Sequence, residues 1–201
     1  MNRPATCWAI IPIKASEDGK SRLASVLDAG ERETLVRTML THVVDAASQA
    51  STIARVCLVG PSRHGVPDDI PLLSDPGEGL NPALQSALAQ IAGEGLDRVI
   101  VVAADLPTVS PQELDLLAAA PANSIAIAPD RHGIGTNAIS LPLPAAQQFA
   151  FGFGIDSYAH HTQEAQRLGL QVETILSHGL EKDIDEPADL PDAGRILEDR
   201  G

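Results

Sequence analysis

The chain has 201 residues, of which 44% are hydrophobic and only 2% aromatic, so its core must be built from Ala, Val, Ile and Leu. The formal net charge of −13 argues against non-specific binding to nucleic acid or to an anionic membrane, because both require a basic surface. No apolar stretch approaches the roughly 20 residues of a membrane span, and the N-terminus lacks the pattern of a secretory signal. Cys7 and Cys57 lie in strand-like runs, so we expect two reduced, buried thiols and a cytoplasmic protein.

Strand-like apolar runs alternate with helical patterns along the chain. The runs that predict strands are 7–13, 55–60, 98–104, 124–129, 137–141 and 170–176. The patterns that predict helices are 29–50, 82–93, 111–120, 156–169 and 187–199. Such alternation implies crossover units and a mostly parallel sheet, and no linker or repeat divides the chain. We therefore expect one doubly wound α/β domain over residues 1–201.

Three of the predicted helices carry start signals. Two of them have the spacing of a capping box, Asp28 with Glu31 and Ser110 with Glu113. The third begins with Asn81 before Pro82, which is typical of an N-cap residue followed by proline at the first helical position. Each signal is local, so it predicts where a helix begins without knowledge of the fold.

Three cations follow the first predicted strand of this acidic chain: Lys14, Lys20 and Arg22. Ligands of doubly wound sheets bind beyond the carboxyl ends of the strands. Lys and Arg both bind phosphate, so the segment predicts a site for a triphosphate. It is not a Walker A loop, because GxxxxGK[ST] is absent, and the alternative is a solvated loop that carries charges.

Three aspartates follow other predicted strands. Asp105 ends the run 98–104, and Asp183 and Asp185 flank Ile184, so in an extended chain they point the same way. Carboxylates that converge at a sheet edge suit Mg²⁺, which usually takes one or two carboxylates together with substrate phosphates. The alternative is that Asp185 caps the helix predicted from residue 187 and Asp105 caps a turn.

Glycine-bearing segments lead into regular structure at 77–81, 133–137 and 152–157. Glycine lets backbone N–H groups approach an anion closely, although each segment alone is also an ordinary turn. His161 follows Ser157 by one helical turn and either faces the same site or, as we expect, is a surface histidine. The sequence has no zinc-ligand pattern, no GxSxG elbow and no GxGxxG after the first strand.

Six segments together resemble a known family. They are IPIKASEDGKSRLA (11–24), GLNPAL (79–84), VVAADLP (101–107), APDRHGIGTNAI (128–139), FGIDSYAHH (153–161) and DIDEPADL (183–190). On these segments the chain resembles the 2-phospho-L-lactate guanylyltransferase family of coenzyme F-420 biosynthesis, within the molybdenum-cofactor-guanylyltransferase-like nucleotidyltransferases. The resemblance implies a single-domain, Rossmann-like, three-layer α/β fold of the nucleotide-diphospho-sugar transferase type with a mostly parallel mixed sheet. The chain departs from the family at Ile155 and Asp156, where Pro or Gly is common.

The resemblance also implies an activity and a site. The enzyme would transfer GMP from GTP to 2-phospho-L-lactate, phosphoenolpyruvate or 3-phospho-D-glycerate and release pyrophosphate. The catalytic residues would be Lys14, Lys20, Arg22 and Asp105. The ligands of Mg²⁺, or of Mn²⁺, would be Asp105, Asp183 and Asp185. The guanine or ribose would contact Gly79, Leu80 and Asn81, and the acceptor would contact Thr136, Gly154 and Ser157.

The resemblance further implies a homodimer and a downstream transferase that attaches the product to a deazaflavin. Other functions stay open on the sequence. The chain could instead be a nucleotidyltransferase that uses CTP or a molybdopterin acceptor, or a non-catalytic nucleotide sensor on the same fold. A phosphohydrolase is disfavoured, because it would need a nucleophilic Asp after the first strand, where Lys14 stands.

Overall fold

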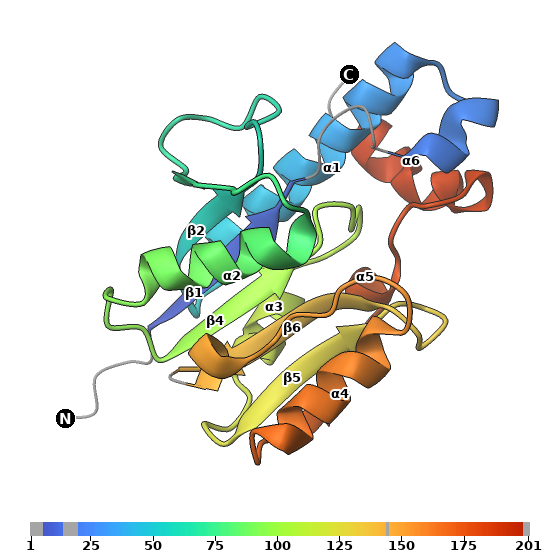
Figure 1. The fold of residues 1–201 in the computed structure, drawn as a ribbon. Coiled ribbons are helices and arrows are strands. Elements are labelled where there is room, and N and C mark those ends of the chain that lie inside the picture. Colours follow the sequence, from blue (N-terminus) through green and yellow to red (C-terminus); the bar gives the residue numbers. More distant parts are fainter. Residues whose placement is uncertain (1–5, 14–19, 144, 199–201) are drawn as a thin grey trace.

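A sheet of seven strands spans the part of the chain that the computed structural model describes, residues 6–13, 20–143 and 145–198 (Figure 1). The strand order is β3-β2-β1-β4-β6-β5-β7. The strands are β1 (Cys7–Pro12), β2 (Ile53–Val59), β3 (Leu72–Leu73), β4 (Arg98–Val102), β5 (Ser124–Pro129), β6 (Thr136–Pro142) and β7 (Gln171–Thr174). All pair in parallel except β6, which is antiparallel to both β4 and β5. The prediction of a mostly parallel mixed sheet is confirmed.

Helices cover both faces of this sheet and make three layers (Figure 1). They are α1 (Ala29–Gln49), α2 (Leu80–Ile91), α3 (Pro111–Ala118), α4 (Ser157–Arg167), α5 (His178–Glu181) and α6 (Leu190–Glu198). Alternate residues of the strands point to opposite faces. In β1, Ala9 and Ile11 pack in the core under α1 and α3, whereas Trp8 and Ile10 pack in the core under α2 and α4. No helix in the described residues is long and apolar enough to cross a membrane.

The reversal of β6 has a consequence for the site. Because β6 runs against its neighbours, its first residues lie at the edge where β4 and β5 end. Thr136 pairs with Pro129 at the end of β5, and Ala138 pairs with Val102 at the end of β4. The first residues of β6 therefore lie beside the last residues of β4 and β5.

The helix-start predictions have mixed outcomes. Both capping boxes are present, with the side chains of Asp28 and Ser110 accepting the N–H groups of Glu31 and Glu113. The Asn81 prediction is wrong, because α2 begins at Leu80 and Gly79 is its N-cap residue. Asn81 lies in the first turn, where its amide binds the backbone of a distant segment instead of its own helix.

The observed bounds of one further helix differ from the predicted bounds, and two short elements were not predicted. The helix predicted over 187–199 begins as a 3-10 turn, η4 (Pro187–Asp189), before α6. The two-residue strand β3 and the one-turn helix α5 were not predicted. Elements this short carry too few residues for a periodic pattern to emerge.

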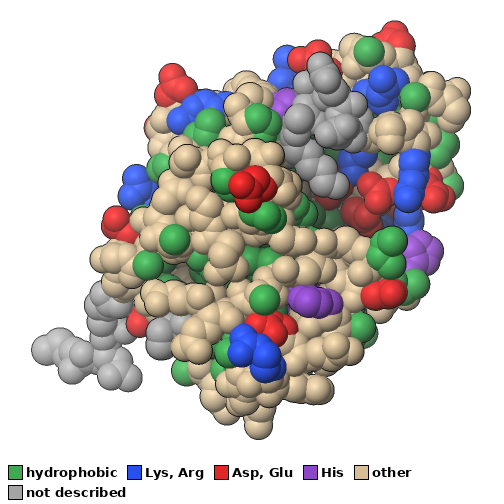
Figure 2. Space-filling view, in the orientation of Figure 1, with side chains coloured by type: hydrophobic (Ala, Val, Ile, Leu, Met, Phe, Trp, Pro, Cys, Tyr) green, Lys and Arg blue, Asp and Glu red, His purple; other side chains and the backbone are tan. Residues whose placement is uncertain are grey.

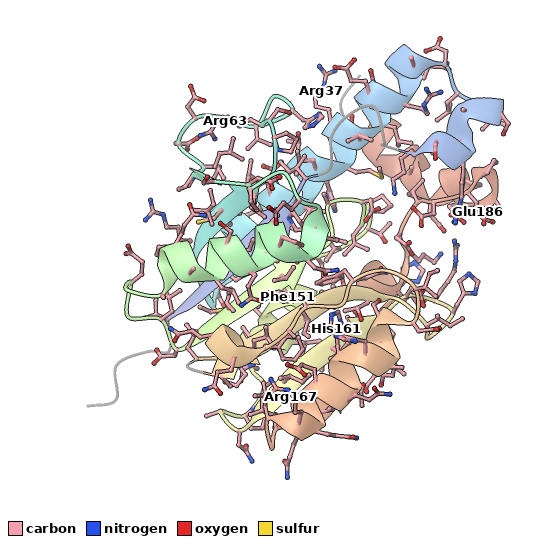
Figure 3. All side chains as sticks on the ribbon, viewed as in Figure 1. Arg37, Arg63, Phe151, His161, Arg167 and Glu186 are labelled. Carbon is pink, nitrogen blue, oxygen red and sulfur yellow. The ribbon has the colours of Figure 1, made fainter. Side chains whose placement is uncertain are left out.

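His161 is completely buried, so the prediction of a surface histidine is wrong (Figure 3). Its ring packs against Phe153, with ring centroids 4.7 Å apart, and against Phe149. Burial, with a further contribution from His160, lowers the pKa of His161 to about 4, and Glu164 opposes that shift. The imidazole is therefore neutral in the folded protein.

We expect the neutral His161 to make stability depend on pH. Below the ordinary histidine pKa of 6.5 the unfolded chain binds a proton that the folded chain refuses until about pH 4. The free energy of unfolding should therefore fall as the pH drops through this window, by at most roughly 3 kcal/mol. Urea unfolding of the wild type and of His161→Gln at about pH 7 and about pH 4.5 measures the difference, which should be smaller in the variant.

His178→Gln is the matched control, because that side chain is 69% exposed. It should leave the pH dependence of the wild type unchanged. Equal pH dependence in the wild type and His161→Gln would show that His161 is not held neutral by the fold.

Candidate active site

Lys20 brings two distant parts of the chain together at the carboxyl edge of the sheet. Its ammonium Nζ donates to Asp105 Oδ2, just beyond β4, and to Asp185 Oδ1 at 2.9 Å, in the segment before η4. The Lys20 side chain is only 9% exposed. Burial alone would lower the pKa of Lys20, but the two carboxylates outweigh it and raise the pKa above its ordinary value. Lys20 is thus a permanent cation that joins two anions.

A small apolar cluster sets the positions of this cation and of one of its partners. Lys20 has a left-handed backbone (φ 57°) and precedes the 3-10 helix η2 (Ser21–Ser25). Leu23 of η2 is buried together with Ile184 and with Met39 of α1. Since Ile184 is buried, the residues on either side of it, one of which is Asp185, face away from this cluster.

Asp183 completes a group of three carboxylates. Its Oδ1 lies 3.4 Å from the Asn137 side-chain nitrogen, which also donates to the backbone of Leu180 at 3.0 Å. Burial raises the pKa of Asp183, and the charges of Asp105 and Asp185 raise it further. Asp105 and Asp185 share the Lys20 ammonium, and Asp183 is near enough to both for their charges to raise its pKa.

An ion pair between the buried carboxylate of Asp189 and the partly exposed guanidinium of Arg131 supports the segment that carries these aspartates. Asp189 accepts the backbone N–H groups of Asp185 at 2.9 Å and of Glu186 at 2.8 Å, and Arg131 donates to its other oxygen at 2.5 Å. Burial opposes ionisation of Asp189, but these donors hold its pKa below the ordinary value. Glu186, not Asp185, is the N-cap residue of η4, so the alternative that Asp185 caps this helix is wrong.

The other predicted phosphate-binding cations are less defined. Lys14 lies outside the described residues. Arg22 is 70% exposed, and its guanidinium lies 3.9 Å from the carboxylate of Glu186. Figure 2 shows acidic and basic side chains side by side in the region of α6 and the segment that leads to it. Among the described cations of the segment, Lys20 alone contacts the predicted metal ligands.

The predicted acceptor-binding residues lie at the same edge of the sheet. Thr136 begins β6 and is 7% exposed, and Ser157 begins α4 and is 2% exposed. Gly154 has a φ of 133°, a conformation that a side chain would strain, and its carbonyl accepts the N–H of Ser157 at 3.3 Å. His161 connects them, because it contacts both Thr136 and the backbone of Gly152.

The predicted guanosine-binding residues form the start of α2. Gly79 has a φ of 99°, and no atom lies within 4 Å of where its Cβ would be, so the backbone there is open to a ligand. Asn81 donates to the Phe153 carbonyl at 3.1 Å and accepts the Phe153 N–H at 2.8 Å. Asn81 therefore ties the start of α2 to the 152–154 segment, a role that the sequence did not indicate.

The carboxylates fit a hard divalent cation. No group of three or more His, Cys, Asp or Glu side chains in the described residues is already arranged to hold a metal ion. Mg²⁺ does not need such a cage, because it usually binds one or two carboxylates and completes its shell with substrate phosphates and water. Three mutually repelling aspartates at a sheet edge supply that kind of donor set.

Solved structures share the fold of this chain. CMP:2-keto-3-deoxy-manno-octonic acid synthetase, in complex with CTP, superposes with a TM-score of 0.66 at 13% identity and covers 98% of this chain and 100% of that one. Rv0371C of Mycobacterium tuberculosis, in complex with manganese, has a TM-score of 0.62 at 17% identity, with 98% and 100% covered. Likeness at this level of identity shows the fold alone.

Curated relatives have higher sequence identity to this chain than these solved structures do. The phosphoenolpyruvate guanylyltransferase of Sphaerobacter thermophilus is 40% identical over 190 residues, 92% of this chain and 91% of the relative. That of Chloroflexus aurantiacus is 42% identical over 184 residues, 88% and 89% of the two chains. The 2-phospho-L-lactate guanylyltransferase of Halorubrum lacusprofundi is 37% identical over 183 residues, 90% and 81% of the two.

The family model described as "Guanylyl transferase CofC like" matches residues 7–196. This match covers every predicted site residue and confirms the resemblance seen in the sequence. The family model and relatives named as guanylyltransferases both match this chain over most of its length. The chain therefore belongs to the CofC-like guanylyltransferase family and is a nucleotidyltransferase.

Proposed function

We propose that this enzyme transfers GMP from GTP to a three-carbon phospho-acid, releases pyrophosphate, and acts in coenzyme F-420 biosynthesis. The observation that carries the proposal is the joining of Lys20 to Asp105 and Asp185 at the carboxyl edge of the sheet. We put phosphoenolpyruvate first as acceptor, since two bacterial relatives at 40% and 42% identity bear that name. 2-Phospho-L-lactate and 3-phospho-D-glycerate are the competing acceptors.

The reaction joins two anions, so repulsion has to be offset. An oxygen of the acceptor phosphate attacks the α-phosphorus of GTP, and the bond from this phosphorus to the pyrophosphate breaks. Lys20, helped by Arg22 and by Lys14, holds the phosphates and stabilises the charge that builds on the leaving pyrophosphate. A phosphate is largely ionised at neutral pH, because its second pKa is about 6, so no general base is required.

The aspartates supply the complementary half of the site. Asp105, Asp183 and Asp185 would hold Mg²⁺, or Mn²⁺, which when bound neutralises phosphate charge and orients the attack. Asp189 keeps the 185–186 backbone in place for this task by accepting its N–H groups. The carboxylates come from two separate segments, so the site depends on the folded sheet.

Two loops would hold the organic parts of the substrates. The open backbone at Gly79 and Leu80 would meet the guanosine, with Asn81 supporting the loop that faces it. The hydroxyl groups of Thr136 and Ser157 and the backbone of Gly154 would bind the acceptor acid. A homodimer and a downstream deazaflavin transferase that takes up the product are part of the same proposal.

The direct test is pyrophosphate release from each of the four nucleoside triphosphates with each of the three acceptors. We expect release with GTP and one phospho-acid, and a product that carries a diphosphate between the acid and guanosine. Release only with CTP would indicate another nucleotidyltransferase. Binding of GTP without release for any acceptor would indicate a sensor.

Asp105→Asn should reduce Mg²⁺-dependent turnover by roughly 100-fold or more, because the substitution removes a charged ligand of the cation. Initial rates at several Mg²⁺ concentrations measure the loss, and chelation should abolish the activity of the wild type. Asp192→Asn is the matched control, since Asp192 pairs with Lys182 outside the cluster, and it should be near normal. A folded Asp105→Asn enzyme with wild-type rates would refute the metal assignment.

Lys20→Ala should lower kcat/KM by about 100-fold and weaken GTP binding, because the cation for the phosphates is lost. The fold should survive, since the side chains of Asp105 and Asp185 are 27% and 49% exposed and water can solvate them. Lys20→Arg keeps the charge and should recover part of the loss. Calorimetric titration with GTP and Mg²⁺ checks the binding, and unchanged affinity in Lys20→Ala would contradict the role.

A further inference from the structure

His161 lies between the two segments that would bind the acceptor, and the proposed function gives it no role. It comes from α4, and its ring is completely buried. Its Nε2 lies 3.1 Å from the Gly152 backbone nitrogen, and its Nδ1 lies 3.0 Å from the Thr136 hydroxyl oxygen. A single imidazole therefore contacts the start of β6 and the segment that leads to Gly154.

The hydrogen-bond directions around this ring follow from elementary chemistry. A backbone N–H can only donate, so Gly152 donates and Nε2 must carry a lone pair. A neutral imidazole with a bare Nε2 has its proton on Nδ1, which therefore donates to Thr136 Oγ1. A doubly protonated ring would set two donors face to face at Gly152, in keeping with the lowered pKa of His161.

This tautomer fixes what the Thr136 hydroxyl can do. The hydroxyl oxygen accepts a hydrogen bond from the Nδ1–H of His161, so its own proton cannot point toward the ring. No other hydrogen bond of this hydroxyl is found within the residues that the structure describes. Thr136 is 7% exposed and begins β6 at the edge of the sheet, so we infer that its O–H, which does not donate to the ring, donates to a ligand there.

The same ring also holds the backbone of the neighbouring segment. Gly152 packs so closely against α4 that a Cβ there would lie 2.0 Å from the His160 ring. Asn81 binds the next residue, Phe153, from the other side through two hydrogen bonds. The segment is thus held from both sides, and His161 links its position to that of Thr136.

We propose that His161 is a positioning residue for the acceptor: it aims the Thr136 O–H and the Gly152–Gly154 backbone at an anionic oxygen of the phospho-acid. The inference rests on the proposed function and adds a residue that determines acceptor binding. His161 makes no contact with substrate itself and moves no proton during the reaction. Its effect should therefore appear in the KM of the acceptor and not in that of GTP.

Two substitutions separate the contacts of the ring. His161→Gln can still accept from Gly152 but lacks a donor at the Nδ1 position, so it should raise the acceptor KM about 3–10-fold, the value of one hydrogen bond. His161→Asn retains an N–H near the Nδ1 position but loses the acceptor for the Gly152 N–H, so it should raise the acceptor KM through the backbone contact instead. In both variants the KM of GTP should change much less. His178→Gln, an exposed histidine, is the control and should match the wild type.

A double-mutant cycle with Thr136→Val tests the path of the effect. If His161 acts through the Thr136 hydroxyl, His161→Gln should raise the acceptor KM no further in the Thr136→Val background. Additive effects, or equal losses for GTP and the acceptor, would indicate a merely structural role and overturn the proposal.

The tautomer can be read in the wild type without any substitution. Two-bond ¹H–¹⁵N spectra of the histidine side chains should show His161 protonated at Nδ1, and protonation at Nε2 would overturn the proposal even if the variants fail to fold. If the wild type turns over none of the acceptors, the proposed function fails, and the spectrum still decides whether Thr136 is held as a donor.

Discussion

The interaction on which the site depends is the contact of one buried ammonium with two carboxylates. Lys20 joins Asp105 and Asp185, which come from the end of β4 and from the chain just before η4. Without a cation, the three aspartates at this edge would repel one another in a protein that already carries a net charge of −13. Burial of an ammonium is costly unless it is paired, so cation and anions each make the position of the other tolerable.

Packing around this contact holds each partner by a different means. Leu23 and Ile184 bury their side chains in one apolar cluster beside α1, which places Lys20 and the 183–185 segment on either side of it. Asp189 fixes the backbone of that segment through hydrogen bonds. The reversed strand β6 brings Thr136 to the same edge. The cation, the carboxylates and the Thr136 residue thus lie at one edge of the sheet although they are far apart in the sequence.

What could be predicted from the sequence was local or followed from a rule about sheets. The capping boxes at Asp28 and Ser110 need only neighbours three residues away, and both are present. The rule that ligands bind at strand ends singled out the charges around Asp105. The burial of His161 and the pairing of Asn81 with Phe153 depend on contacts across the fold. The sequence around a polar residue does not indicate its hydrogen-bond partner when that partner lies on a distant element, because the packing of helices on the sheet decides which residues meet.

In the proposed function, the position of Lys20 also links the binding of GTP to the binding of the divalent ion. In the structure Lys20 forms ion pairs with Asp105 and Asp185, and in the reaction it would bind the phosphates of GTP. It leaves the carboxylates more easily when another cation takes over their charge. If GTP bound alone and drew Lys20 to its phosphates, the aspartates would be left without a cation. If a divalent ion bound alone, it would be repelled by the Lys20 ammonium. Each is therefore expected to bind better when the other is present. Such coupling is reciprocal by thermodynamic necessity, and here it would arise from an exchange of partners that leaves no charge in the site unpaired.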